Sequence, residues 1–211
     1  EYEGTDVHHL LYLPVNWKSG GKYPVIVEYA GNGPYHNKYG DVSDGTVEGS
    51  KLGYGITAGK GFIWLCLPYV NLDEKINQRQ WWGDVDATAD YCRKAVGKIC
   101  NEYGGDGNNL IIAGFSRGAI ACNFIGLHDD KISALWKAFI AFSHYDGVRE
   151  DWGYPGADRA SALKRLKRLK GRPQFICNEG DSCAATEEYL KSTGVKGDFS
   201  IQPTFFRNHN D

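Results

Sequence analysis

Apolar runs and amphipathic stretches alternate along the chain, which is the pattern of an α/β protein with a mostly parallel sheet covered on both faces. Strands are predicted where short runs of β-branched and aromatic residues lie between turn residues. The unbroken apolar run at residues 62–67 predicts a central strand that is buried on both faces. The full set of predicted strands covers residues 10–15, 23–29, 62–67, 110–114, 138–142, 174–178 and 199–206.

The clearest helix is predicted to begin at Asp84. Apolar residues recur from there at intervals of four and three with charges between them, and Gly104 and Gly105 end the pattern. No internal repeat and no shift in composition divides the 211 residues, so we expect residues 1–211 to form a single domain. Weaker amphipathic patterns predict further helices over residues 117–128, 160–170 and 184–192.

The charge balance provides no surface for binding nucleic acid, because charged residues make up 24% of the chain and the formal net charge is −2. The basic run at residues 164–170 contains leucines at intervals of three, which predicts an amphipathic helix with a solvated face. No apolar run reaches the roughly 20 residues of a membrane span. We therefore expect a soluble protein with neither a nucleic-acid nor a membrane partner, and the sequence leaves its oligomeric state open.

The sequence contains neither a signal-peptide pattern nor a methionine, so we expect a mature or trimmed product, for which secretion is one candidate location. Cys177 and Cys183 bracket a predicted loop and are the best candidates for a local disulfide. Cys66 and Cys122 lie in apolar runs and should be buried. No histidine or cysteine cluster has metal-ligand spacing and no glycine-rich phosphate loop occurs, so no metal or cofactor is expected.

One motif carries the strongest chemical information. The residues Gly114-Phe115-Ser116-Arg117-Gly118 follow a predicted strand and precede a predicted helix. A Gly-x-Ser-x-Gly sequence in that context is typical of a nucleophile elbow, in which the serine occupies a strained turn and small residues let strand and helix approach closely. Because glycine makes up 27 of the residues, a purely structural glycine turn is the alternative. We predict that Ser116 is a nucleophile.

A serine nucleophile needs a histidine to take its proton and an acid to orient that histidine. His209 is the preferred base, because it lies in a polar turn after the last predicted strand, and His144 is its main competitor. The preferred acid is Asp181, which lies between a strand end and a predicted helix. Glu179 is the second choice for the acid and Asp146 is the third.

The oxyanion of an acyl-transfer intermediate needs two backbone donors. The N–H of Arg117, directly after the serine, is the first candidate. The second should come from the loop at residues 29–33, where glycines let the backbone turn its amides toward the site, and we favour Asn32 over Gly31.

Aromatic residues in the predicted loops point to the substrate. Two adjacent tryptophans precede the helix at Asp84, and we expect one to pack inward while the other lines a cleft. Tyrosines on other loops could complete an aromatic wall for a carbohydrate or aryl ester, with core packing as the alternative for each. The side chains of two arginines could bind a carboxylate or an acidic sugar. The cleft candidates are Trp81, Trp82, Tyr35, Tyr145 and Arg79, and Arg117 is the second arginine.

An elbow serine, an acid and a histidine, each after a successive strand, resemble the α/β-hydrolase superfamily over nearly the whole chain. The short chain without a lid domain is similar to the dienelactone-hydrolase-like and small-esterase branches. The resemblance implies a three-layer α/β-hydrolase sandwich with a mostly parallel central sheet, no separate lid domain, a Ser–His–acid triad and no cofactor. Two departures are the oxyanion loop Tyr29-Ala30-Gly31-Asn32, which lacks the usual His-Gly start, and an end two residues after His209.

These patterns predict a serine esterase, which hydrolyses a small-molecule or polymer carboxylic ester through an acyl-enzyme. A peptidase of the same superfamily is the alternative enzyme, and cleavage of aminoacyl amides would distinguish it. A non-catalytic binding protein on a hydrolase scaffold is the third hypothesis.

Overall fold

The computed structural model describes residues 2–38, 40, 42–180 and 182–205. Seven strands form one sheet in the order β1-β5-β2-β8-β9-β10-β11. Strand β1 is antiparallel to β5 and the other neighbours are parallel, which confirms the predicted mostly parallel sheet. The strands are β1 (Leu10–Tyr12), β2 (Tyr23–Tyr29), β5 (Ile63–Leu67), β8 (Gly105–Phe115), β9 (Ala138–Phe142), β10 (Pro173–Glu179) and β11 (Asp198–Thr204).

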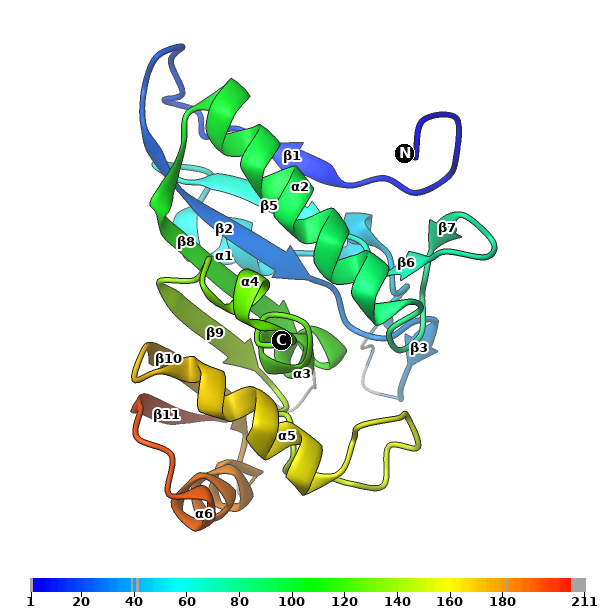
Figure 1. Cartoon of the computed structure of the whole chain (residues 1–211), viewed down its shortest axis with the longest axis vertical. Coiled ribbons are helices and arrows are strands. Elements are labelled where there is room, and N and C mark those ends of the chain that lie inside the picture. The colour runs from blue at the N-terminus through cyan, green and yellow to red at the C-terminus, as the bar shows by residue number, and fades with distance from the viewer. Residues whose placement is uncertain (1, 39, 41, 181, 206–211) are drawn as a thin grey trace.

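Helices lie on both faces of this sheet, so the fold has three layers (Figure 1). Helices α2, α3 and α5 lie on one face and the short α1 lies on the other. Two small antiparallel ribbons, β3–β4 and β6–β7, extend from the loops. The remaining elements are α1 (Leu52–Thr57), α2 (Val85–Tyr103), α3 (Arg117–Phe124), α4 (Asp130–Ser133), α5 (Arg159–Leu166), α6 (Ser182–Thr193), the 3-10 turns η1 (Val47–Gly49) and η2 (Lys167–Leu169), β3 (Tyr35–His36), β4 (Val42–Ser43), β6 (Val70–Asn71) and β7 (Ile76–Asn77).

The ends of α2 follow from its sequence. The side chain of Asp84 accepts a hydrogen bond from the N–H of Ala87, which satisfies one of the unpaired donors of the first turn. Gly104 ends the helix in the left-handed conformation, with φ of 77°. The helix predicted from residue 84 is thereby confirmed.

Strand β2 shows how one strand serves two cores. Val25, Val27 and Tyr29 belong to the larger core beneath α2 and α3, whereas Ile26 belongs to the smaller cluster on the α1 face. Strand β5 is buried along its whole length, as its apolar run predicts. The prediction that it is central is wrong, because β5 lies second from one edge and β8 is the middle strand.

A buried carboxylate, Glu28, attaches α1 to the sheet. It is 1% exposed and accepts hydrogen bonds from four donors. Burial raises the pKa of its carboxyl, and these donors oppose that shift. Three of the donors are backbone N–H groups at the start of α1, which has no other acceptors for them. The donors are the N–H groups of Lys51, Leu52 and Gly53 and the indole Nε1 of Trp64.

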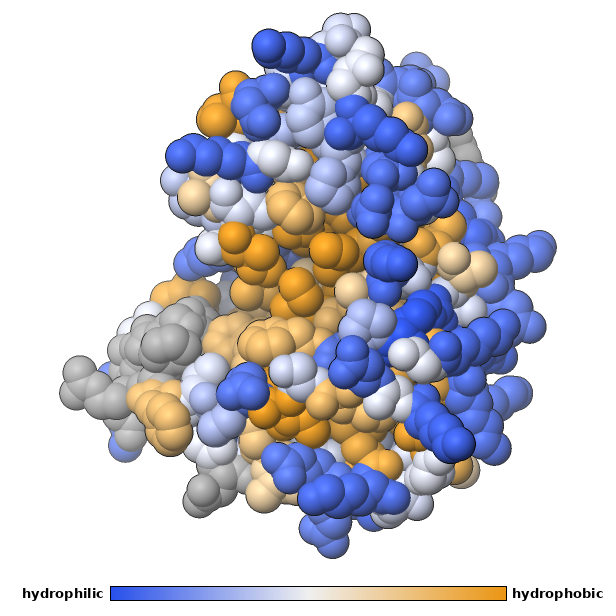
Figure 2. All heavy atoms as spheres, turned by 90° about the vertical axis from the view of Figure 1, so that its left-hand side faces the viewer, coloured by the Kyte–Doolittle hydropathy of each residue, from blue (hydrophilic) through white to orange (hydrophobic). Residues whose placement is uncertain are grey.

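The α1 face is less completely covered than the opposite face. In the described part of the chain, α1 contacts β2 and β8, and η1 contacts β5. Phe175 in β10 is 43% exposed, and period-two alternation with buried Ile176 puts it on the α1 face. Figure 2 shows apolar residues gathered in a band across one side of the molecule.

The cysteines are all free thiols, so the candidate disulfide between Cys177 and Cys183 is not formed. Cys66 and Cys122 are buried, as their apolar surroundings predict. Within the described ranges, no helix has the length and apolar character needed to cross a membrane.

Replacing Glu28 tests whether this carboxylate holds α1. We expect Glu28→Ala to lower the free energy of unfolding by about 3 kcal/mol or more, because it leaves buried donors without an acceptor. Glu28→Gln keeps one acceptor oxygen and should fall between the wild type and the alanine variant. Urea unfolding followed by tryptophan fluorescence measures both, and an alanine variant as stable as wild type would contradict this role.

Candidate functional site

Ser116 lies at a sharp turn between β8 and α3. Its backbone has φ of 56° and ψ of −114°, a conformation that residues other than glycine rarely adopt. Its N–H donates to the carbonyl of Phe142 at 2.9 Å, and its own carbonyl accepts from the N–H of Ala119 at 3.0 Å. The turn is therefore fixed both to β9 and to the first turn of α3, and it leaves the serine half-buried.

The glycines of the motif are required by close backbone contacts. A Cβ on Gly118 would lie 1.9 Å from the carbonyl oxygen of Tyr29 in β2. A Cβ on Gly114 would lie 2.1 Å from the carbonyl oxygen of Gly118. Because both clashes are with backbone atoms, neither can be relieved by a change of rotamer. The spacing in the motif thus reflects how closely strand, turn and helix pack.

Unpaired backbone donors lie next to the serine. Among the described residues, the N–H groups of Arg117 and Asn32 donate no hydrogen bond. Arg117 is the first residue of α3, where N–H groups have no acceptor within the helix. The side-chain Oδ1 of Asn32 accepts from the N–H of Trp81 at 2.8 Å, which fixes the loop that follows β2. Both N–H groups are thus without an acceptor in this part of the chain, and their role as oxyanion donors stays a prediction.

The side chain of Arg117 is 1% exposed and its guanidinium bonds to backbone carbonyls, so the prediction that it could bind an anionic ligand is wrong. Its guanidinium lies 3.9 Å from the centre of the Tyr69 ring. Burial lowers its pKa to about 10, which leaves it charged at neutral pH. Five backbone carbonyls from three separate segments accept its hydrogen bonds. They belong to Ala30, Gly31, Gly45, Gln78 and Trp81.

Ser116 opens into a cavity of about 390 Å³, which we call the serine cavity. Its polar residues include Ser116, His144 and Arg149. The volume lies in the range of small-molecule sites, and the mixture of aromatic walls with a few polar groups is typical of them. The aromatic residues of the lining are Tyr35, Trp81, Phe115 and Trp152.

The two adjacent tryptophans have different environments, as predicted. Trp81 lines the serine cavity, and its ring lies 5.4 Å from that of Trp152. Trp82 is 4% exposed and stacks on Phe124 at 4.3 Å. Trp82 therefore belongs to the core, which corrects its prediction as a cleft residue and leaves Trp81 as the tryptophan that faces the cleft.

Two further cleft predictions are wrong. Tyr145 is 3% exposed, and its hydroxyl bonds to the side chain of Gln174 inside the core. Arg79 is not part of the serine-cavity lining; its Nε donates to the carbonyl of Asp44 at 2.7 Å and so ties two loops together. Tyr35 does line the cavity, in agreement with the prediction.

Only some of the candidates for base and acid belong to the described residues. His209 and Asp181, the preferred pair, lie outside the described residues. His144, the competing base, lines the serine cavity, where its ring is 5.2 Å from that of Trp152.

Among the alternative acids, Glu179 and Asp146 differ sharply. Glu179 ends β10, and its Oε1 accepts from the hydroxyl of Ser143 at 2.8 Å, just past the end of β9. Asp146 is 2% exposed, and both of its oxygens accept from Arg165, at 2.8 and 2.9 Å. Asp146 therefore serves a buried ion pair, and Glu179 is the described carboxylate at the sheet edge that carries Ser116.

Sequence reasoning missed Arg149 and Phe115. Arg149 lines the serine cavity, stacks on Trp152 at 4.2 Å and pairs with Asp151. The sequence offered only an arginine two residues before an aspartate in a polar loop. Phe115 could have been found from its position directly before the elbow serine. Among the described residues, no cluster of three or more potential ligands could hold a metal ion.

Comparison with known proteins identifies the fold. No protein-family model and no curated protein matches the sequence. Solved structures do match over nearly the whole chain, and they include esterases and dipeptidyl peptidases with the α/β-hydrolase fold. The chain has this fold, in the three-layer form with a mostly parallel central sheet.

Three solved structures illustrate the likeness. A putative dipeptidyl aminopeptidase IV from Bacteroides ovatus is 18% identical with a TM-score of 0.64, over 97% of this chain and 31% of that one. An acetyl ester-xyloside bifunctional hydrolase from Caldicellulosiruptor lactoaceticus is 16% identical with a TM-score of 0.60, over 94% and 78%. Esterase 2 of Thermogutta terrifontis, phosphonylated by cyclosarin, is 17% identical with a TM-score of 0.56, over 96% and 84%. The chain spans about half of a matched thermostable esterase (51%).

The close approach at the elbow predicts that Gly118→Ala is strongly destabilising. We expect the free energy of unfolding to fall by more than about 2 kcal/mol, since a backbone oxygen occupies the space of the new methyl group. Gly97→Ala is the matched control, because Gly97 lies within α2 and its added Cβ would meet no atom within 4 Å. Chemical denaturation should show the control unchanged or more stable by about 0.5–1 kcal/mol. Equal stability of the two variants would contradict the packing argument.

The buried guanidinium predicts a graded response at residue 117. Arg117→Met should cost about 3 kcal/mol or more, because it leaves buried carbonyls without donors. Arg117→Lys keeps the charge but lacks the planar set of donors, so its loss should be smaller. Hydrogen exchange should report increased opening of the loops at residues 30–33 and 78–81 in both variants. Unchanged exchange in the methionine variant would show that these loops do not depend on Arg117.

Proposed function

We propose that the protein is a serine-dependent hydrolase of carboxylic esters. The observation that carries the proposal is the strained turn at Ser116, which holds a hydroxyl at a cavity next to two residues with unpaired backbone N–H groups. Such donors stabilise the oxyanion of an acyl-transfer intermediate without reorganising during the reaction. The solved structures with the same fold include several esterases, which supports hydrolysis as the class of reaction.

In the proposed reaction His209 takes the proton of the Ser116 hydroxyl as the oxygen attacks the ester carbonyl. The N–H groups of Arg117 and Asn32 hold the oxyanion. Collapse of the intermediate expels the alcohol, which receives the proton from the histidine. Water, activated by the same histidine, then hydrolyses the acyl-enzyme and restores the serine. Asp181 is the proposed acid that orients the histidine, and Glu179 is the alternative.

The aromatic lining of the serine cavity favours a substrate ester that carries a flat or cyclic group. Trp81, Trp152 and Tyr35 line the cavity, and carbohydrate and aryl groups commonly pack against aromatic rings. One solved structure of the same fold is an acetyl ester-xyloside hydrolase, which fits a carbohydrate ester. We also propose that the protein belongs to a dienelactone-hydrolase-like or small-esterase branch of the α/β-hydrolases.

A peptidase is the second candidate, because dipeptidyl peptidases are also among the structures with this fold. Paired assays with p-nitrophenyl acetate and with aminoacyl p-nitroanilides separate the two activities. Preferential cleavage of the anilides would replace the esterase proposal with the peptidase one.

Ser116→Ala should abolish hydrolysis of p-nitrophenyl acetate, with a loss in kcat of ~10⁴-fold or more, because the nucleophile is removed. A fluorophosphonate probe should label the wild-type protein at Ser116 and leave the variant unlabelled. Equal turnover by the two proteins would contradict the mechanism. An inert but well-folded wild type would favour the non-catalytic binding protein.

The same assay separates the two pairs of candidates for base and acid. His209→Gln should remove activity, whereas His144→Gln should leave most of it. Asp181→Asn should lower kcat by ~10³-fold or more, and Glu179→Gln should have a smaller effect. The reverse order in either pair would transfer the role to the other residue.

A further inference from the structure

The serine cavity has an excess of positive charge in its lining. The guanidiniums of Arg117 and Arg149 both belong to it, and no carboxylate lines it in the described part of the chain. A cleft lined by charge of one sign concentrates ligands of the opposite sign. The cavity that holds Ser116 therefore favours an anionic group.

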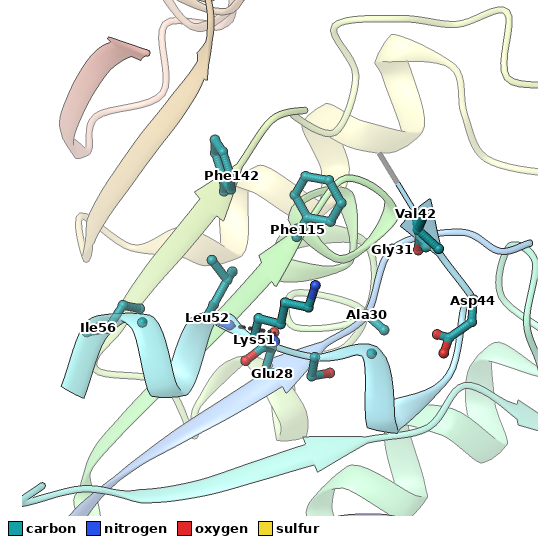
Figure 3. A pocket seen from close by; sticks show the side chains of 14 residues that line it. Glu28, Ala30, Gly31, Val42, Asp44, Lys51, Leu52, Ile56, Phe115 and Phe142 are labelled. Carbon is teal, nitrogen blue, oxygen red and sulfur yellow. Dashed lines mark hydrogen bonds between the residues drawn. The ribbon is translucent and has the colours of Figure 1, made fainter. Parts of the chain in front are cut away.

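A second cavity, of about 320 Å³, has a different balance of charge (Figure 3). It is lined in part by α1, and the carboxylates of Glu28 and Asp44 line it together with the ammonium of Lys51. The excess of positive charge thus distinguishes the serine cavity from this neighbouring space.

The two arginines of the serine cavity differ in what their donors do. Arg117 is buried, and its guanidinium donates to backbone carbonyls. Arg149 is exposed, and its Nε and Nη2 donate to the two carboxylate oxygens of Asp151 at 3.0 and 2.8 Å. These bonds use two of the five N–H groups of a guanidinium. Among the described residues nothing accepts from Nη1 of Arg149, so this arginine has donors left for a ligand.

The contacts of Arg149 also fix the plane of its guanidinium. The group stacks on the ring of Trp152 at 4.2 Å, while Asp151 occupies the edge formed by Nε and Nη2. The edge formed by Nη1 and the second N–H of Nη2 has the same spacing of donors, and it can bind a second carboxylate through two parallel hydrogen bonds. Because the side chain is already held in place, binding at this edge costs little further side-chain entropy.

Asp151 does not cancel the charge that Arg149 brings to the cavity. Its side chain is exposed, and it is not part of the lining. Water and salt screen an exposed carboxylate, so the ion pair is weak and leaves the guanidinium attractive to a second anion.

We infer that Arg149 is a specificity-determining residue that binds a carboxylate on the substrate, an inference that rests on the proposed esterase function. The substrate class is an ester that carries a free carboxylate on one of its two halves, such as a monoester of a dicarboxylic acid or an ester of an acidic sugar. Ser116 and Arg149 line the same cavity of about 390 Å³, so the ester carbonyl and the carboxylate bind in one continuous space.

Two matched pairs of esters test this inference through kcat/KM. Monoethyl adipate and ethyl hexanoate differ in having a carboxylate or a methyl group at the end of the acyl chain. The compounds p-acetoxybenzoate and p-acetoxybenzamide differ in the charge of the leaving alcohol. The pair that responds to the substitution of Arg149 identifies the half of the substrate that carries the carboxylate.

Arg149→Met should lower kcat/KM for the anionic member of at least one pair by about fivefold, because an exposed charge pair is partly screened, and should leave its neutral member within about twofold. Arg149→Lys keeps the charge without the planar edge, so its loss should be smaller. Raising sodium chloride to about 0.5 M should reduce the wild-type rate on the anionic ester and have little effect on Arg149→Met.

Arg159→Met is the matched control. Arg159 is also an exposed arginine that pairs with a nearby carboxylate, Glu150, and lies over an aromatic ring, that of Tyr189. It does not line the serine cavity, so its substitution removes the same charge and should leave all four esters unchanged. Equal losses on the neutral and anionic members in Arg149→Met, or no loss on either anionic ester, would overturn the inference and leave the esterase proposal intact.

Binding without turnover keeps the two proposals separable. In the Ser116→Ala protein, titrations followed by ligand-observed NMR should show that adding Arg149→Met weakens binding of the anionic member about fivefold and leaves the neutral member within about twofold. If wild type hydrolyses no ester, the esterase proposal falls, and this difference in binding would still support a carboxylate site. Binding of both anionic compounds that does not depend on Arg149 would overturn the inference.

Discussion

The site depends on the hydrogen bonds that the buried guanidinium of Arg117 donates to backbone carbonyls. An arginine carries five N–H donors in a fixed plane, so one side chain can satisfy carbonyls that come from different directions. Here it joins the loop after β2, the segment at Gly45 and the segment that carries Trp81. The same residue begins α3 directly after Ser116. One side chain therefore holds the loops that line the serine cavity in place beside the nucleophile. Pre-organisation of this kind is what electrostatic stabilisation of an oxyanion requires.

The sequence predicted the elements that are determined locally. Strand β2 begins and ends where its apolar run does, and α2 begins at a side-chain cap and ends at a left-handed glycine. The elbow was predictable for the same reason, since its glycines are needed by contacts within a strand-turn-helix unit and with the adjacent strand. Local chemistry thus determined both the α/β architecture and the position of Ser116.

Roles that depend on the direction of a side chain could not be predicted. The sequence could not distinguish Trp81 from Trp82, because the difference depends on the tertiary fold. Trp82 stacks on Phe124 in the core, whereas Trp81 lines the serine cavity. Arg117 resembled a ligand-binding arginine, yet its side chain turns back to the backbone. A second cavity, of about 320 Å³, had no sequence signal either, since its walls come from segments a hundred residues apart, such as those of Val42 and Phe142.

Buried carboxylates show how the fold separates structural charges from those available for chemistry. A charge is tolerated in the interior only where its partners replace the lost water. Glu28 meets this condition through the N–H groups at the start of α1, and Asp146 meets it through the forked guanidinium of Arg165. A carboxylate whose oxygens are both engaged in this way has little capacity left to orient a histidine. Glu179 lies instead at the end of β10, at the edge of the sheet where Ser116 lies, and its Oε1 accepts from the hydroxyl of Ser143 just past the end of β9.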